Sequence, residues 1–224
     1  MSTEKVTVYP LDGDSPFPMD RREFYEEQVE EYKTKGKPSK AVEVANIFLF
    51  NSDGDLIVQK RSESKAHNAG LLDKSTGGHV TFGDSPDYTV MVETIQELQV
   101  PSITVRTQEE FLKTFKLLNN YLNTVAIVKQ VGTEIKPMEK IIKGEKILIA
   151  NKIDLYFGVF NGAVKMVDKE AKGIMFYSLE ELKDGLEKSP DMFTYDLKYL
   201  VGAHEQEIRE LLDSISPMLR NHQK

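Results

Sequence analysis

Residues Gly77–Val100 give the strongest indication of the fold, with the sequence Gly-Gly-His-Val-Thr-Phe-Gly-Asp-Ser-Pro-Asp-Tyr-Thr-Val-Met-Val-Glu-Thr-Ile-Gln-Glu-Leu-Gln-Val. The stretch begins as a glycine-rich loop, and its second half predicts a helix over Pro86–Leu98. Residues three and four apart share one face of a helix, so Glu93, Gln96 and Glu97 are expected to point the same way. Two carboxylates and an amide oxygen are therefore predicted to converge beside a glycine turn.

A second set of residues in the same helix recurs at helical spacing and is apolar. This stripe is expected to dock the helix on the rest of the protein, and it consists of Tyr88, Met91, Ile95 and Leu98. The acidic face is then left free. Hard oxygen ligands arranged in this way suit Mg²⁺ or Mn²⁺, which bind carboxylates and bridge to a substrate phosphate. The alternative is that the acids form only a solvated helix face.

The loop and helix together resemble the signature of the Nudix hydrolase family. That signature runs Gly, five residues, Glu, seven residues, Arg-Glu, an aliphatic residue, any residue, Glu-Glu, any residue, Gly and an aliphatic residue. With Gly78 as the first glycine, the spacing holds throughout, and the two family glutamates that are kept fall on Glu93 and Glu97. Several identities depart from the signature, at Asp84, Val92, Thr94, Gln96 and Gln99.

Three of these departures have consequences for the helix and its carboxylates. Val92 replaces an arginine that orients the neighbouring carboxylates in the family, and losing such support typically weakens metal binding or activity by about 10–100-fold. Gln96 keeps an oxygen but no charge, which lowers the attraction for a divalent cation. Gln99 must leave the helix without the freedom of glycine at positive φ, although Pro101 offers another stop.

The resemblance extends over residues 42–200 and implies an α/β fold, the Nudix-type α/β/α sandwich with a central mixed sheet. Val44–Phe50 is a buried-strand pattern, and the residues at 51–54 (Asn-Ser-Asp-Gly) predict a hairpin turn before a returning strand at 56–60. Towards the C-terminus, the stretch 170–182 resembles the last strand and helix of the family.

The order of the segments is similar to the isopentenyl diphosphate isomerase-like branch of the family. That branch uses a cysteine in the Gly-His segment to handle a proton, whereas this chain contains no cysteine and has Gly77 there. Glycine offers no side chain for proton transfer, so isomerisation is not expected. Diphosphate hydrolysis is the natural inference from the resemblance.

The resemblance also implies roles for individual residues. Glu93 and Glu97 are the expected catalytic residues and metal ligands, and Gln96 and the Gly78 carbonyl complete the expected metal set, although Gly78 has the alternative of serving only a tight turn. The expected substrate-binding residues each have a structural alternative, namely a local hydrogen bond for the loop histidine and an exposed strand end or surface for the others: Arg61, Lys60, His79 and Glu170. Arg61 is suited to bind phosphate through two parallel hydrogen bonds.

The chain is expected to divide into an N-terminal strand-helix extension at 1–40 and a Nudix-like domain at 41–224. The extension either shapes the substrate side or serves as a dimer arm or plain packing. Within the domain, Thr107–Leu122 predicts a helix that starts with a capping box. Two strands, at 124–131 and 147–159, are expected around a charged hairpin or loop at 137–145, and a single final helix is expected over 196–212.

Composition limits the possible functions. The 224-residue chain has a hydrophobic content of 40% and can bury a sizeable core, while its net charge of −7 disfavours binding to a nucleic acid polymer. No apolar stretch approaches the roughly 20 residues that span a bilayer, so no membrane partner is expected. The absence of cysteine and of a secretory h-region favours the cytoplasm.

The sequence therefore predicts a divalent-metal-dependent hydrolase that acts on a nucleoside diphosphate derivative or a related small-molecule diphosphate, and a homodimer is possible. The alternative is a catalytically weakened Nudix-fold protein that binds a nucleotide or regulates without cleavage. The missing arginine and Gln96 favour this alternative.

Overall fold

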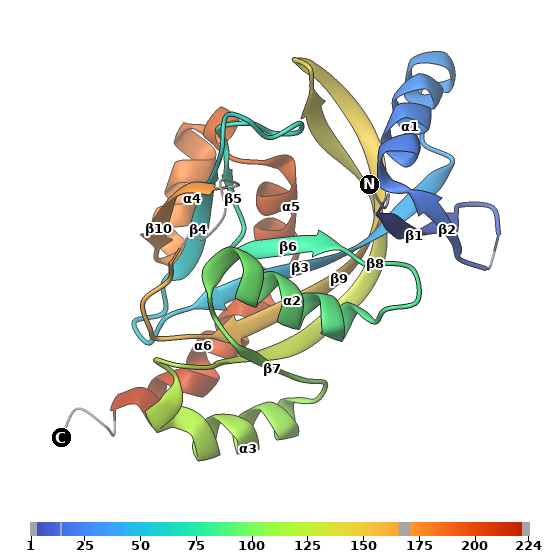
Figure 1. Ribbon diagram of the computed structural model, residues 1–224. Helices are drawn as coiled ribbons and strands as arrows, with labels where there is room; N and C mark the ends of the chain where they lie inside the picture. Colours follow the sequence, from blue (N-terminus) through green and yellow to red (C-terminus); the bar gives the residue numbers. More distant parts are fainter. Residues whose placement is uncertain (1–3, 14, 166–170, 221–224) are drawn as a thin grey trace.

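A curled mixed sheet forms the centre of the protein in the computed structural model, which describes residues 4–13, 15–165 and 171–220 (Figure 1). The long path through the sheet has the strand order β10-β4-β3-β9-β8-β7, while β1 and β6 pair with β3, β2 with β1, and β5 with β4. The strands are β1 (Lys5–Pro10), β2 (Phe17–Asp20), β3 (Lys40–Phe50), β4 (Leu56–Arg61), β5 (Leu72–Asp73), β6 (Thr76–His79), β7 (Ser102–Val105), β8 (Ala126–Ile142), β9 (Glu145–Val159) and β10 (Ala171–Tyr177).

Helices cover both faces of this sheet, which confirms the expected α/β sandwich (Figure 1). They are α1 (Arg21–Lys35), α2 (Pro86–Leu98), α3 (Gln108–Leu118), α4 (Leu179–Lys188), α5 (Tyr195–Ala203) and α6 (Glu205–Arg220). Within the described residues, no helix has the length and apolar character needed to cross a bilayer.

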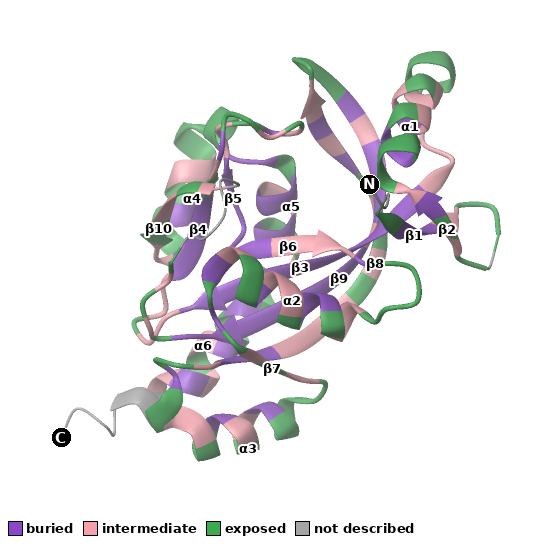
Figure 2. Ribbon diagram, viewed as in Figure 1, coloured by how far each residue is buried: buried purple, intermediate pink, exposed green. Residues whose placement is uncertain are grey.

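The alternation of β3 divides the core into two clusters. Phe48 and Phe50 point into a large cluster shared with α1, α3, α4, α5 and α6, whereas Ile47 and Leu49 point into a smaller cluster with α2. Figure 2 shows both faces of β3 as buried, as expected for a strand covered on each side. Asn46 is a polar residue between Val44 and Phe48 on the face of β3 that packs into the large cluster.

The helix α2 has the predicted bounds but not the predicted docking face. Tyr88, Met91 and Ile95 are exposed, and of the expected stripe only Leu98 is buried. The helix is docked instead by Val90 and Leu98, with the small, buried Thr94 between them on the same face. Thr94 also bonds to the hydroxyl of Ser102 at 2.9 Å. The face that docks α2 is therefore centred on a short side chain that contacts the start of β7.

Gln99 ends α2 in the left-handed conformation, with φ 56°, where the family signature has glycine. Its N–H caps the helix by donating to the carbonyls of Ile95 and Thr94. Gln99 therefore adopts the left-handed conformation at the end of α2 that glycine adopts more easily.

The hairpin expected at 137–145 is present, and the alternative of a loop there is wrong. β8 and β9 form one long hairpin whose tight turn contains Lys143 and Gly144, both at positive φ. Pro137 is tolerated in β8 because β7 pairs only with 126–129, which leaves the far half of β8 at the sheet edge. The final helix is also two helices, α5 and α6, with His204 between them.

The N-terminal segment is built into the sheet. β1 pairs with β3, and Val6, Val8 and Phe24 belong to the large core cluster. Asp20 caps α1 by accepting hydrogen bonds from the backbone N–H groups of Arg22 and Glu23. This fixes the start of α1 beside β6.

Candidate active site

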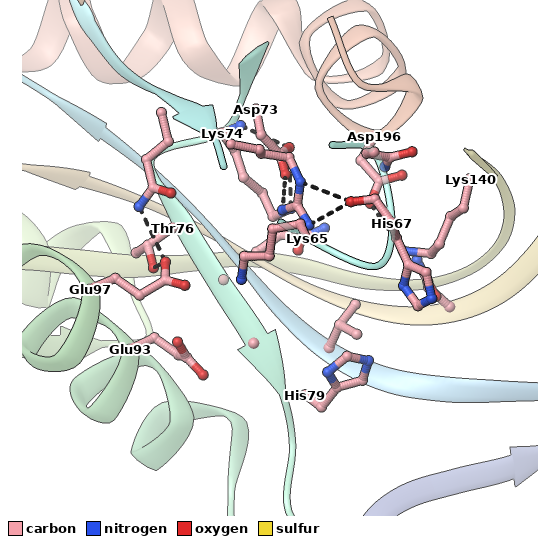
Figure 3. A pocket seen from close by; sticks show the side chains of 18 of the residues that line it. Lys65, His67, Asp73, Lys74, Thr76, His79, Glu93, Glu97, Lys140 and Asp196 are labelled. Carbon is pink, nitrogen blue, oxygen red and sulfur yellow. Dashed lines mark hydrogen bonds and ion pairs between the residues drawn. The ribbon is translucent and has the colours of Figure 1, made fainter. Parts of the chain in front are cut away.

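A polar pocket opens on the face of β3 that carries Val44 and Asn46, and parts of the chain that lie far apart in sequence line it (Figure 3). Five cationic and five acidic side chains lie along its walls: Arg21, Arg61, Lys65, Lys74 and Lys140, with Glu4, Asp73, Glu93, Glu97 and Asp196. Val44 is the aliphatic side chain of the lining. Such a pocket suits a charged, hydrogen-bonding ligand.

Glu93 and Glu97 of α2 form what we call the carboxylate wall of the pocket. They reach it across β6, where Gly77 and Gly78 carry no side chains (Figure 3). A Cβ built at position 78 would overlap the carboxylate of Glu93. Gly78 therefore has a packing role that only glycine can fill, because it allows Glu93 to approach the strand.

Glu97 is held in place by two neighbours. Its Oε2 accepts hydrogen bonds from Thr76 Oγ1 and, at 3.2 Å, from Gln59 Nε2. Thr76 and Gln59 are both buried, so the two donors are fixed by the sheet. This support replaces part of what the missing arginine at Val92 gives in the family signature.

Gln96 does not join this wall. Its side chain is exposed and lies outside the pocket lining, although it shares helical spacing with Glu93. Within the described residues, no group of three His, Asp or Glu side chains is placed to hold a metal ion. Two carboxylates nevertheless fit Mg²⁺, which proteins commonly bind through one or two carboxylates together with the phosphates of the substrate.

Arg61 and Lys60 end β4 in different environments. Arg61 lines the pocket and is anchored there, with Nη1 3.0 Å from Asp73 Oδ2 and Nη2 donating to the His67 carbonyl at 3.0 Å. Lys60 is exposed and lies outside the lining. Glu170 lies outside the described residues.

Asp73 organises the cationic side of the pocket. Its Oδ1 accepts from Thr194 Oγ1 at 2.8 Å, and Lys74 Nζ lies 3.4 Å from the same oxygen. Burial alone would raise the pKa of this carboxyl, but Lys74 and Arg61 hold the pKa of Asp73 well below its usual range. The carboxylate stays ionised and keeps both cations in position.

His79 lines the pocket, and the N-terminal helix bonds to it. Its Nε2 is 2.9 Å from the hydroxyl of Tyr25, and the Tyr25 ring packs on His67 with centroids 4.3 Å apart. Burial, then the charges of Lys140 and Arg21, lower the pKa of His67 to about 4. Burial, then Arg21 and Lys140, also hold the pKa of His79 well below its usual value. Both imidazoles are therefore neutral at pH 7.

Sequence reasoning missed several lining residues, and some of them leave a trace in the sequence. Asn46 is a lone amide inside the apolar stretch Val44–Phe50, and this kind of interruption marks a buried strand that faces a polar site. Lys65 and Lys74 also line the pocket, and no motif spacing in the sequence distinguishes them from other lysines. Tyr25 and Lys140 reach the pocket only through tertiary structure.

Comparison with known proteins bears on the fold. No family model matches the chain. An isopentenyl-diphosphate Delta-isomerase from Serratia proteamaculans is 28% identical over 166 residues, which cover 72% of this chain and 77% of the relative. The crystal structure of DR0079 from Deinococcus radiodurans has a TM-score of 0.56 at 18% identity, covering 89% of this chain and 98% of that one. The chain has the Nudix fold.

Other solved structures of similar architecture include a NUDIX family hydrolase from Clostridium perfringens. Its TM-score is 0.45 at 12% identity, and the match covers 79% of this chain and 97% of that one. The Nudix fold expected from the loop and helix at 77–100 is confirmed by the match to the Deinococcus structure.

Proposed function

We propose that this protein is a divalent-metal-dependent hydrolase of a nucleoside diphosphate derivative or a related diphosphate. The observation that carries the proposal is the meeting of the carboxylate wall with a set of cations in one pocket. The spacing of the Nudix signature assigns metal binding and catalysis to these two glutamates, and the cations of the pocket lining support binding of a diphosphate.

The charge balance of the pocket supports a metal. The cationic and acidic side chains are equal in number, so the cations do not outweigh the acids. A diphosphate without a metal would be repelled by the negative charges of the carboxylate wall. Glu93 and Glu97 would hold a Mg²⁺ or Mn²⁺ ion together with the phosphates, and the Gly78 carbonyl is a further candidate ligand. A bound divalent cation neutralises phosphate charge and activates water for attack.

The residues of the chain then have separate tasks. Thr76 and Gln59 keep the Glu97 carboxylate directed into the pocket. Glu93 is the candidate general base, since it lies on the same wall. Asp73 holds Arg61 in place. The remaining N–H groups of Arg61 can then bind a phosphate at little cost in side-chain entropy.

Hydrolysis is favoured over isomerisation by the backbone around Gly77. A Cβ built at that position would lie 2.6 Å from the carbonyl oxygen of Ala45 and 2.8 Å from Lys74 Cε. A cysteine cannot be placed there without moving the strand. The diphosphate in the name of the Serratia relative fits the charged group we assign, while its isomerase chemistry does not fit this position.

A Nudix-fold binding protein is the second candidate function. The exposed Gln96 and the lack of a three-member metal group within the described residues favour it. Both candidates place a diphosphate in the same pocket and differ in whether it is cleaved.

The deciding experiment measures binding and turnover side by side. The protein is incubated with Mg²⁺ or Mn²⁺ and a panel of nucleoside diphosphate derivatives, dinucleoside polyphosphates and prenyl diphosphates, and phosphate and nucleotide release are followed. We expect Glu97→Gln to lower kcat by at least about 100-fold, more than the roughly 10–100-fold typical of losing a group that only supports a ligand.

Glu109→Gln is the matched control, because Glu109 is an exposed glutamate on α3 paired with Lys113 at 2.7 Å. It should leave kcat unchanged. Tight binding across the panel with no turnover in the wild type would select the binding protein. A wild type that neither binds nor cleaves any member would overturn both candidates.

A further inference from the structure

The outer side of α2 is apolar, whereas the outer side of a surface helix is normally polar. Its large exposed side chains are Tyr88 (50% exposed), Met91 (38%) and Ile95 (51%), which helical spacing places on one arc. The helix lies at the front of the molecule in Figure 1, while its buried Val90 and Leu98 pack towards the sheet. We call the arc of Tyr88, Met91 and Ile95 the outer stripe.

No charged side chain interrupts the outer stripe. The residues beside it are the half-buried Val92 and the exposed Gln96 and Gln99, all of them uncharged. The two glutamates of the helix, Glu93 and Glu97, line the pocket instead. Neighbouring apolar side chains without charges among them are typical of the centre of a protein–protein contact, where tyrosine and methionine are also enriched.

The two ends of α2 carry opposite charges. Asp84 comes directly before the N-cap Ser85, and its exposed carboxylate has no ion-pair partner among the described residues. Lys165 lies at the other end, because its backbone N–H donates to the Leu98 carbonyl at 3.2 Å. Its exposed ammonium group is likewise unpaired within the part of the chain that the structure describes. The outer stripe therefore lies between an acid and a base.

This arrangement is complementary to a second copy of itself. When two copies of α2 pack antiparallel about a twofold axis between positions 91 and 92, Tyr88 of each copy lies level with Ile95 of the other. The same register brings Asp84 level with position 99 of the other copy, at the end where Lys165 lies. Parallel packing would bring each charge against its like, and the helix dipoles also favour the antiparallel arrangement.

We infer that α2 is the contact surface of a homodimer, in which two copies of the chain pack their outer stripes together in antiparallel orientation. The inference goes beyond the proposed function and does not depend on it. Glu93 lies two residues from Ile95, which places it on the opposite side of the helix. The contact therefore does not involve the carboxylate wall.

The size of the surface sets the strength of the dimer. A helix of 13 residues is roughly 20 Å long and 10 Å wide, so one face offers less than the roughly 800 Å² per partner of a standard interface. Interfaces at the small end of the range are transient. We therefore expect a reversible dimer with a Kd in the micromolar range.

Two other occupants fit the surface less well. A lipid surface attracts helices that carry Lys and Arg beside the apolar face, whereas α2 has neither and the chain has a net charge of −7. A protein of another sequence could cover the outer stripe. The match between the two ends of α2 favours a second copy, because the acid of one copy meets the base of the other.

The first test measures molecular mass against concentration. Sedimentation velocity of the wild type should show a monomer at about 1 μM and mostly dimer at about 300 μM. Ile95→Lys places a cation in the contact and should raise Kd at least about tenfold. Leu117→Lys is the matched control, because Leu117 is a 76% exposed apolar residue on another helix, α3. It should dimerise as the wild type does.

A charge exchange tests the antiparallel register. Asp84→Lys and Lys165→Asp should each raise Kd at least about threefold, because each brings like charges together at both ends of the contact. The double variant with both changes restores opposite charges and should return Kd to nearly the wild-type value. Both residues are exposed, so these variants should fold even where Ile95→Lys does not.

Each outcome supports or overturns the inference. A wild type that stays monomeric up to about 300 μM would overturn the homodimer and leave the outer stripe to a partner of another sequence. A dimer that tolerates Ile95→Lys in its folded form would show that the contact lies elsewhere. A double charge variant that dimerises no better than the single variants would overturn the antiparallel packing.

Discussion

Glu97 and Asn151 line the same pocket, yet the protein satisfies their polar atoms very differently. The Glu97 carboxylate accepts hydrogen bonds from Thr76 and Gln59, whereas the Asn151 amide has no partner among the described residues. The carboxylate wall is therefore fixed before any ligand arrives. Asn151 is fully buried, more deeply than the half-buried Glu97, but lacks the contacts that would make its burial favourable.

This difference indicates where stability has been given up for binding. Hydrogen bonds to charged groups contribute roughly 1.5–3 kcal/mol, and unpartnered buried polar groups cost roughly 1–3 kcal/mol each. Changes at the carboxylate wall should lower activity with modest effects on stability. Removal of the unpartnered Asn151 amide should stabilise the fold. The predictions below test the two ends separately.

Gly78→Ala should have the largest effect at the carboxylate wall. The added Cβ would occupy the place of the Glu93 carboxylate, which must then swing away from the pocket. We expect kcat/KM to fall by about 10–100-fold, as when the support of a metal ligand is lost. Tm should change little, because the atom that must move is the end of a flexible side chain.

Gly132→Ala provides the matched control for that change. Gly132 also lies in a strand, β8, but a Cβ there would meet no atom within 4 Å. Its activity should equal that of the wild type. Full activity in Gly78→Ala would show that the position of Glu93 does not matter and would remove it from the proposed site.

A smaller effect is expected from pH at the other end of the pocket. The folded pKa of His67 is about 4, below the roughly 6.5 of an unfolded histidine, because of burial and the nearby cations. Between these values the unfolded chain binds more protons, so stability rises with pH and is lost as the pH falls from about 6.5 to 4. His67→Gln should remove on the order of 1–2 kcal/mol of this pH dependence.

Urea titrations at pH 4.5, 5.5 and 7.0 measure that difference directly. Identical pH dependence in His67→Gln and the wild type would show that His67 is not held neutral by its surroundings.

The fold was predictable from local patterns. The helix at Pro86–Leu98, the turn at 51–54 and the capping box of Thr107 with Glu110 all appear as expected, because each depends on residues close together in the chain. The docking face of α2 was not predictable, because Tyr88, Met91 and Ile95 form an apolar stripe at the same helical spacing as the face that is buried. The face with Val90, Thr94 and Leu98 is the one that packs on the sheet, and no helical period contains that information.

The candidate site was predictable only where the family spacing reached. Gly78, Glu93 and Glu97 line the pocket together, as expected, whereas Gln96 is exposed outside it. Helical spacing groups Gln96 with the two glutamates but does not tell which residues of that face reach the pocket. The position of Asn151 depends on the register of β3 with β9, and that of Asp196 on where α5 is placed. The expected single helix over 196–212 did not separate α5 from α6. Such contacts follow from tertiary structure alone.

The smallest predicted effect tests the end of α2, outside the pocket. Gln99 is exposed and holds φ 56°, where an L-residue is strained by about 1–2 kcal/mol and glycine is not, although glycine loses more entropy on folding. Gln99→Gly should therefore raise the free energy of unfolding by about 0.5–1 kcal/mol, and Tm by about 1–4 °C. Gly36→Ala makes the reverse change at the end of α1, at φ 71° with open space around it, and should destabilise by a similar amount. Because neither residue touches the pocket, kcat/KM should stay at the wild-type value in both, and a change in Gln99→Gly would mean that the carboxylate wall senses how its helix ends.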